Sequence, residues 1–207
     1  MFYWLMKNLI VGPILRAAFR PWVIGHSNIP ATGALIIASN HLSFIDSVFL
    51  PLLIDRRISF LAKSDYYTGR GMKGWFQRTF LTAAGMLSID RSGGKASEAS
   101  LQTGLGVLRR NEVLGIYPEG TRHTPAKLAR AQEKIRESDP QTADLADRLH
   151  HLLPPRLGGV LALLDESDRA DVVVFGHVGL DGFEKVSDIW SGDLNGTTVR
   201  VKFWRYP

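Results

Sequence analysis

The sequence of 207 residues predicts an α/β protein with a mixed, mostly parallel sheet and helices on both of its faces. Short apolar runs alternate along the chain with longer amphipathic stretches, as in sheets whose strands are connected by helices. Some of these runs are apolar at nearly every position, for example residues 172–175, which fits strands that are buried on both faces. An N-terminal amphipathic helix, residues 1–21, precedes this pattern, and residues 22–207 are expected to form one domain.

The individual elements follow from the positions of the apolar runs and the turn residues. Strands are expected at 22–24, 34–38, 58–62, 86–89, 113–117, 172–178 and 197–204. Helices are expected in the longer stretches between them, at about 44–50, 71–82, 95–110 and 125–152. Pro140 divides the last stretch into two helices, because proline cannot continue a helix interior. Mixed charges along 125–152 indicate a solvent-exposed helical insertion.

Residues 1–21 are dense in aromatic and aliphatic side chains. Polar or small residues recur there at a spacing of four, so a helix gathers them into one stripe: Asn8, Gly12, Arg16 and Arg20. Pro13 is expected to kink or split this helix. No apolar run reaches the roughly 20 residues that a spanning helix needs. We therefore expect an anchor in the lipid headgroup region, with its arginines on anionic lipid. The alternative is a helix packed on the protein's own core.

Charge and cysteine content narrow the classes of function. Lys and Arg number 25 against 20 Asp and Glu, a formal charge of +5 that favours anionic partners. No block of basic residues resembles a nucleic-acid patch, so nucleic acid is not expected as a partner. The absence of cysteine excludes disulfides, thiolate zinc sites and a cysteine acyl-enzyme, and is compatible with a cytosolic compartment. His150 and His151 lack a third ligand at suitable spacing, so no metal site is expected.

The most informative stretch is residues 40–46, directly after the predicted strand 34–38. His41 and Asp46 are five residues apart, and on one regular helix their side chains would diverge by about 140°. They can meet if His41 lies on the loop before a helix and Asp46 lies in its first turn. An imidazole held by a carboxylate is a general base. The alternative is structural: Ser43 caps the helix, Asp46 completes the capping arrangement, and His41 is an ordinary turn residue.

A second stretch, residues 117–122, follows the predicted strand 113–117. Pro118 cannot continue a central strand. Gly120 allows a positive φ or a close backbone approach to a ligand. Thr121 and Arg122 then present a hydroxyl and a guanidinium. Because ligands of open α/β sheets bind outside the carboxyl ends of the strands, both stretches are expected to line one crevice.

Together these stretches resemble the glycerolipid acyltransferase family, whose best-known members are the 1-acylglycerol-3-phosphate acyltransferases. The first family block, Asn-His-four residues-Asp, matches residues 40–46, and the third, Phe-Pro-Glu-Gly-Thr-Arg, matches residues 117–122 with Tyr117 for the usual Phe. A weaker block matches Gly85 to Arg91. Beyond residue 125 the similarity is thin. There, Pro155, Arg156 and Gly159 fit an element of a branch that acylates lysocardiolipin or lysophosphatidylinositol.

The resemblance implies transfer of an acyl group from a thioester to a lysophospholipid hydroxyl, with His41 as the base and Asp46 holding its tautomer. No Gly-x-Ser-x-Gly elbow is present, so neither an acyl-enzyme nor a soluble α/β hydrolase is expected. Backbone amides near the helix start are expected to stabilise the oxyanion. The co-substrate is acyl-CoA or acyl carrier protein, and no cofactor is expected. The expected acceptor is 1-acylglycerol 3-phosphate, giving phosphatidate. Glycerol 3-phosphate, another lysolipid and a non-catalytic lipid-binding homologue stay open as alternatives.

The resemblance also implies a phosphate site, since arginine and lysine match phosphate oxygens. The expected substrate-binding residues are Lys63, Arg91, Glu119, Gly120, Thr121 and Arg122. Glu119 is expected to orient either Arg122 or a loop amide. The sequence departs from the family at His123, where many relatives carry Ser, and at residues 172–178, where the block usually contains proline. The protein is expected to associate with membrane lipids on the cytoplasmic face.

Overall fold

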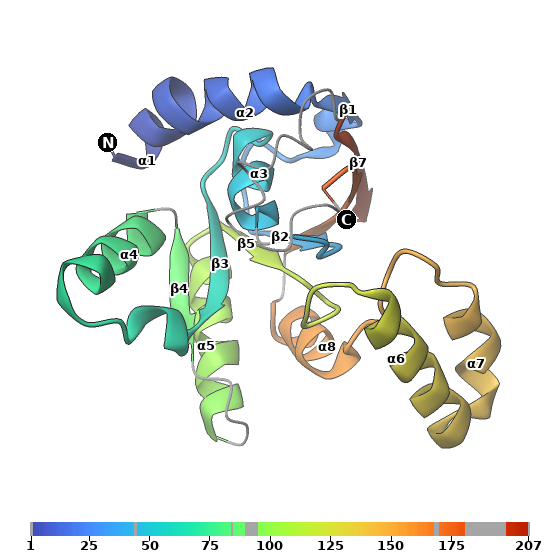
Figure 1. The fold of residues 1–207 in the computed structure, drawn as a ribbon. Coiled ribbons are helices and arrows are strands. Elements are labelled where there is room, and N and C mark those ends of the chain that lie inside the picture. The colour runs from blue at the N-terminus through green and yellow to red at the C-terminus, as the bar shows by residue number, and fades with distance from the viewer. Residues whose placement is uncertain are drawn as a thin grey trace.

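A computed structural model describes residues 2–43, 45–83, 85–89, 95–167, 170–180 and 198–206 (Figure 1). Within these ranges seven strands form one sheet in the order β1-β7-β6-β2-β5-β3-β4. The strands are β1 (Trp22–Ile24), β2 (Leu35–Ser39), β3 (Ile58–Lys63), β4 (Met86–Ile89), β5 (Val113–Ile116), β6 (Asp171–Val178) and β7 (Arg200–Tyr206). Strands β6, β2, β5, β3 and β4 are mutually parallel, while β7 is antiparallel to β6 and β1 runs parallel to β7. The expected mixed, mostly parallel sheet is confirmed.

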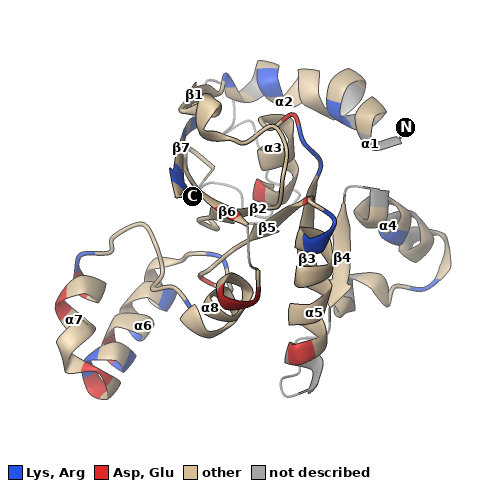
Figure 2. Cartoon of the chain, turned by 180° about the vertical axis from the view of Figure 1, so that it is seen from behind, with Lys and Arg blue, Asp and Glu red and all other residues tan. Residues whose placement is uncertain are grey.

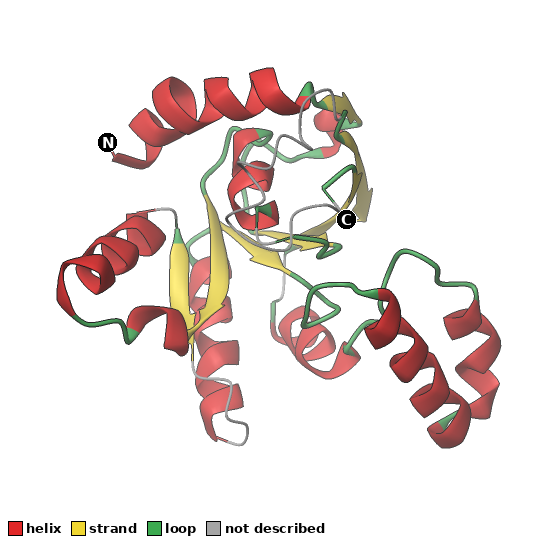
Figure 3. Ribbon diagram, in the orientation of Figure 1, coloured by secondary structure: helices red, strands yellow, loops and turns green. Residues whose placement is uncertain are grey.

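Helices lie on both faces of this sheet (Figure 3). The α-helices are α1 (Phe2–Leu5), α2 (Val11–Phe19), α3 (Asp46–Leu52), α4 (Gly71–Ala83), α5 (Lys95–Arg109), α6 (Pro125–Ser138), α7 (Pro140–Asp147) and α8 (Leu157–Glu166). A π-helical turn, η1 (Met6–Ile10), joins α1 to α2, and two 3-10 turns are η2 (His26–Asn28) and η3 (Ser64–Tyr67). Helix α8 was not among the helices expected from the sequence, and α3 begins two residues later than expected.

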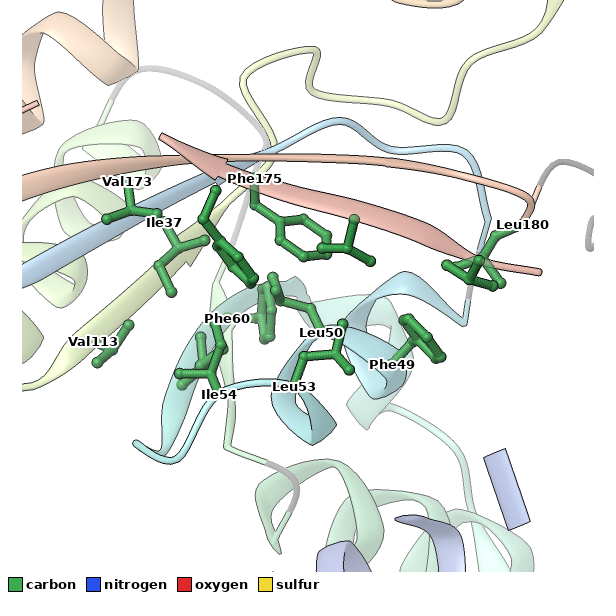
Figure 4. Close-up of a cluster of buried hydrophobic side chains, with 14 of the residues drawn as sticks. Ile37, Phe49, Leu50, Leu53, Ile54, Phe60, Val113, Val173, Phe175 and Leu180 are labelled. Carbon is green, nitrogen blue, oxygen red and sulfur yellow. The ribbon is translucent and has the colours of Figure 1, made fainter. Parts of the chain in front are cut away.

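The larger core lies between the sheet and the face covered by α2 and α3. Side chains of β2, β5 and β6 meet side chains of α3 and the segment that follows it (Figure 4). Phe49, Leu50 and Ile54 are each at most 1% exposed. On the other face α5 and α8 pack Leu105, Leu108 and Leu163 against the strands. Burial of both faces explains why β2 and β5 read as continuous apolar runs.

The helical insertion consists of α6 and α7, which stand apart from the sheet (Figure 1). Pro140 begins α7, as the sequence predicts, and Thr124 caps α6 by accepting a hydrogen bond from the Lys127 amide. The side-chain amide of Gln132 in α6 donates to the carbonyls of Ala146 and Leu149, in and just after α7. Arg136 and Asp147 form an ion pair between the two helices at 2.9 Å. Both charge signs are present on this pair (Figure 2).

The N-terminal helix packs on the domain by the side opposite to the expected one. Arg16 donates to the Leu52 carbonyl at 2.9 Å and Lys7 donates to the Ile54 carbonyl, while Gly12 is buried. Arg16 thus contacts the domain while it remains exposed, and its expected contact with anionic lipid stays a prediction. These donors supply partners for carbonyls at the C-terminal end of α3, which have none within the helix. Pro13 does not split the N-terminal helix into two, since η1 continues directly into α2.

Several large apolar side chains of this helix are exposed. Trp4, Leu9 and Ile14 are 60%, 60% and 63% exposed. In the described ranges, no helix combines the length and apolar character needed to cross a bilayer.

Candidate active site

The two sequence motifs meet at the carboxyl edge of the sheet. Strands β2 and β5 pair in parallel, with Ala38 opposite Ile116. The chain therefore leaves both strands at the same edge, one into the loop 40–45 and the other into the loop 117–123. The His123 amide donates to the His41 carbonyl at 2.7 Å, which ties the two loops together. The two motifs therefore lie at one edge of the sheet, as the sequence predicts.

His41 and Asp46 converge. Nδ1 of His41 lies 3.0 Å from Oδ2 of Asp46, which sits at the first position of α3 with only 1% of its side chain exposed. The same oxygen accepts the amides of Leu42 at 2.8 Å and Ser43 at 2.9 Å. An oxygen that accepts two amides also accepts from the ring, so Nδ1 carries the proton. In the neutral ring this tautomer leaves Nε2 as a hydrogen-bond acceptor, and the side chain is 19% exposed.

The structural alternative is partly realised in the same contacts. Asp46 accepts the Ser43 amide, as a capping arrangement requires. Ser43 is not the N-cap, because Ile45 occupies that position and makes no side-chain capping bond. The carboxylate therefore both shapes the loop and holds the imidazole, and these two interpretations do not compete.

Several amides of the loop that precedes α3 already have hydrogen-bond partners. Four of them donate to side chains: His41 to Glu119, Leu42 and Ser43 to Asp46, and Ile45 to the Ser43 hydroxyl. These four amides are used within the loop, so the expected oxyanion contact, which stays a prediction, would have to come from amides further into the first turn of α3.

Glu119 connects the site to a third segment. Its Oε1 accepts the His41 amide at 3.2 Å and its Oε2 accepts the Leu153 amide at 3.3 Å. Glu119 therefore orients a loop amide, which is one of the two roles expected for it. Glu119 is 5% exposed, and burial raises the pKa of its carboxyl, with the two amides opposing that effect and Asp46 adding to it.

Gly120 has a φ of 69°, in the left-handed region that favours glycine. A Cβ at this position would lie 3.0 Å from Cδ of Arg156, so the Arg156 side chain crosses directly over the glycine. The Arg156 amide also donates to the Pro118 carbonyl at 2.8 Å. The segment 153–156, which the sequence links only loosely to the family, therefore borders the site.

Lys127 stabilises the turn that presents Thr121 and Arg122. Its Nζ donates to the Thr121 hydroxyl at 2.9 Å and to the Arg122 carbonyl at 3.0 Å. Arg122 is half-buried at this edge. Lys127 was not among the expected site residues. Its position in the first turn of the helix predicted after the motif could have indicated this contact.

Two expected phosphate ligands cannot be placed by their side chains. Lys63 ends β3, which is parallel to β5, so its backbone reaches the same edge. Nothing is described of its side chain. Arg91 lies outside the described residues. In the described part of the chain, no three His, Cys, Asp or Glu residues gather as metal ligands would.

Tyr117 supports the His41 ring from one side. The two rings stack with centroids 4.0 Å apart and an interplanar angle of 18°. The phenol and the Ser47 hydroxyl form a hydrogen bond of 2.8 Å. Burial, followed by the charge of Asp46, raises the pKa of Tyr117 well above 10.0, so the phenol stays protonated. The stack restricts rotation of the imidazole and keeps it in line with Asp46.

A family model described as Acyltransferase matches residues 20–144, which include both motifs. The chain belongs to the acyltransferase family. Over 101 residues it is 28% identical to the 1-acyl-sn-glycerol-3-phosphate acyltransferase of Bacillus subtilis (strain 168), covering 48% of this chain and 47% of that protein. The chain thus spans about half the length of this curated relative.

The fold of this acyltransferase family member is also similar to a solved structure. The crystal structure of the 1-acyl-sn-glycerophosphate (LPA) acyltransferase, PlsC, from Thermotoga maritima matches with a TM-score of 0.56 and 18% identity. The match covers 97% of this chain and 70% of that one. At this identity the likeness establishes the shared fold.

Proposed function

We propose that the protein transfers a fatty acyl group from a thioester to the hydroxyl of a lysophospholipid, with 1-acylglycerol 3-phosphate as acceptor and phosphatidate as product. The observation that supports this most strongly is the His41–Asp46 pair, whose Nδ1 to Oδ2 distance is 3.0 Å. The similar proteins from Bacillus subtilis and Thermotoga maritima are both named for this acceptor, which favours the same assignment.

In the proposed reaction Nε2 of His41 accepts the proton of the acceptor hydroxyl. The hydroxyl oxygen attacks the thioester carbonyl carbon, and a tetrahedral oxyanion forms. The carbon–sulfur bond then breaks, and the proton held by His41 passes to the departing thiolate. Asp46 stabilises the imidazolium between these steps, as in other carboxylate–histidine pairs. No covalent acyl-enzyme is needed.

The acceptor's phosphate is proposed to bind cations at the carboxyl edge of the sheet. Arg122 is placed there by the turn that Lys127 holds, and Lys63 and Arg91 complete the proposed set. Glu119, Gly120 and Thr121 shape this turn rather than supply charge to the phosphate. The net charge of +5 suits both an anionic lipid and an anionic donor such as acyl-CoA or acyl carrier protein.

The proposed site of action is the cytoplasmic face of a membrane. Trp4, Leu9 and Ile14 form an exposed apolar side of the N-terminal helix, an arrangement that suits binding within the headgroup region. Since Arg16 and Lys7 are turned toward α3, apolar contact carries this proposal rather than charge.

An acceptor panel tests the function. The protein is incubated in detergent with labelled acyl-CoA or acyl carrier protein and, separately, lysophosphatidate, glycerol 3-phosphate and lysophosphatidylinositol. Lysophosphatidate is expected to be the best acceptor. His41→Ala is expected to lower the rate by about 10² to 10⁴, the usual worth of a general base. His151→Ala, which removes an exposed histidine far along the chain, is the control. Wild-type protein that binds lysophosphatidate without acylating it would favour the non-catalytic alternative.

A further inference from the structure

His177 lies beside the catalytic loop, at the end of β6. Strand β6 pairs in parallel with β2 as far as Phe175 opposite Ser39. Beyond that point the Asn40 side chain continues the pairing: its amide nitrogen donates to the His177 carbonyl at 2.9 Å, and its oxygen accepts the His177 amide at 3.0 Å. The asparagine of the first family block thus sets the position of His177 relative to His41.

The imidazole of His177 faces the carboxylate that holds His41. Its side chain is 1% exposed, and Nε2 lies 3.3 Å from the Asn40 carbonyl oxygen and 3.8 Å from Oδ1 of Asp46. Both neighbours of this nitrogen are acceptors. Nε2 therefore carries a proton, and its N–H group is directed at these two oxygens.

The two oxygens of Asp46 are in different situations. Oδ2 accepts from the His41 ring and from the amides of Leu42 and Ser43. Oδ1 is buried and has no hydrogen-bond partner among the described residues. A buried acceptor without a hydrogen bond lowers the stability of the folded protein. The donor that faces Oδ1 is Nε2 of His177. A distance of 3.8 Å exceeds a hydrogen bond, but catalytic hydrogen bonds are often long in unliganded enzymes and tighten when substrate binds.

We propose that His177 is a positioning residue for proton transfer at His41, an inference that rests on the proposed acyltransferase function. Its N–H group stabilises the ionised carboxylate of Asp46 through the oxygen that His41 does not use. Asp46 then keeps one orientation while His41 carries the proton of the acceptor hydroxyl. Without this donor the carboxylate charge is less compensated, so His41 holds its proton more tightly and acts as a base only at higher pH. The other titratable groups that interact with Asp46 are Tyr117 and Glu119.

Three substitutions separate this role from simple packing. His177→Phe keeps a ring and removes the donor. His177→Gln places an amide nitrogen near the position of Nε2, and His177→Asn carries the same group on a side chain one carbon shorter. We expect His177→Phe to lower kcat about tenfold with little change in KM, the usual effect of losing one hydrogen bond to a charged group. We expect His177→Gln to retain most of the activity and His177→Asn to resemble the Phe variant.

The pH dependence of kcat/KM is the second measurement, because its acid limb reports the essential base of the free enzyme. We expect this limb to move to higher pH in His177→Phe and to stay in place in His177→Gln. His151→Phe serves as the control for loss of an imidazole elsewhere, and thermal unfolding of each variant reports any loss of packing. A loss of stability without a shift of the acid limb is what a purely structural His177 would give.

The outcomes separate this inference from the function on which it rests. Wild-type protein that acylates no acceptor overturns the proposed function and this inference with it. An active wild type whose His177→Phe variant keeps its kcat and its acid limb overturns the role of His177 alone. If His177→Phe does not fold, the comparison of His177→Gln with His177→Asn decides. Equal kcat values and equal acid limbs in those two variants would overturn the proposal.

Discussion

Side-chain hydrogen bonds complete both ends of α3, with opposite results for the surface. At the N-terminal end, Asp46 and Glu119 accept amides of the loop that precedes the helix. At the C-terminal end, Arg16 and Lys7 donate to carbonyls. Both sets of hydrogen bonds provide partners for backbone groups that have none within the helix.

The difference lies in what each arrangement leaves accessible. Around Asp46 the bonds hold an imidazole whose second nitrogen is available for chemistry. On the N-terminal helix Arg16 and Lys7 contact carbonyls at and just after the end of α3, while apolar side chains such as Leu9, 60% exposed, face outward. One set of polar contacts thus positions the proposed base, and the other belongs to the helix that is proposed to meet lipid. Four substitutions test this contrast, in order of decreasing effect.

The largest effect is expected for Asp46→Asn. The amide can still accept a backbone N–H, but its nitrogen cannot accept from the His41 ring, so the ring loses its preferred tautomer and the partner of its imidazolium. We expect kcat to fall by about 10² to 10⁴, measured as acyl transfer to lysophosphatidate. Asp147→Asn, an exposed carboxylate on α7, is the control. A kcat for Asp46→Asn close to that of the control would contradict the assigned role.

A smaller effect is expected at Glu119. Replacing it with Ala leaves the amides of His41 and Leu153 without an acceptor, so the free energy of unfolding should fall by about 2 kcal/mol, measured by denaturant titration. Unchanged stability would show that neither bond contributes.

The Glu119→Gln variant tests the pH dependence of the same residue. Burial raises the pKa of Glu119 above its ordinary 4.5, so its favourable contribution is fully present below pH 4.5 and is lost as the pH rises through the raised value. The neutral Gln variant lacks this dependence. Wild-type protein should therefore gain stability relative to Glu119→Gln as the pH is lowered from 7 toward 4.5. A constant difference between the two proteins across this range would exclude the raised pKa.

The smallest effect is expected on the helix surface. Leu9→Ser should weaken binding to anionic phospholipid vesicles about tenfold, since it removes an apolar side chain that the lipid would cover. Leu145→Ser on α7 is a matched control, because the two leucines are 60% and 62% exposed. Vesicle sedimentation measures both variants. Equal losses in the two, or none in either, would show that this side of the helix does not face lipid.

The sheet and the first catalytic contact can be predicted from sequence, because both depend on local patterns. Apolar runs identify the strands, and the spacing of His41 and Asp46 admits a contact only across a loop–helix junction. Helix α8 escapes prediction because Gly158 and Gly159 lower its helix propensity. The approach of His177 and the stack of Tyr117 on His41 depend on the register of strands distant in sequence, which no local pattern reveals.

The N-terminal helix shows a different limit of sequence analysis. A spacing of four identifies which residues share a side, but not which side meets the rest of the protein. Arg16 and Lys7 face the domain because carbonyls at the end of α3 need donors, and that need is visible only in three dimensions.

The α6–α7 insertion leaves and rejoins the chain within the active site. Its entry is tied by the bond from His123 to His41, and its exit by the bonds from Leu153 to Glu119 and from Arg156 to Pro118. The connection between these two points can therefore change in length and sequence while the reacting groups keep their places. Shortening or exchanging this insertion is thus a way to learn whether it affects the choice of acceptor while the His41–Asp46 pair is left intact.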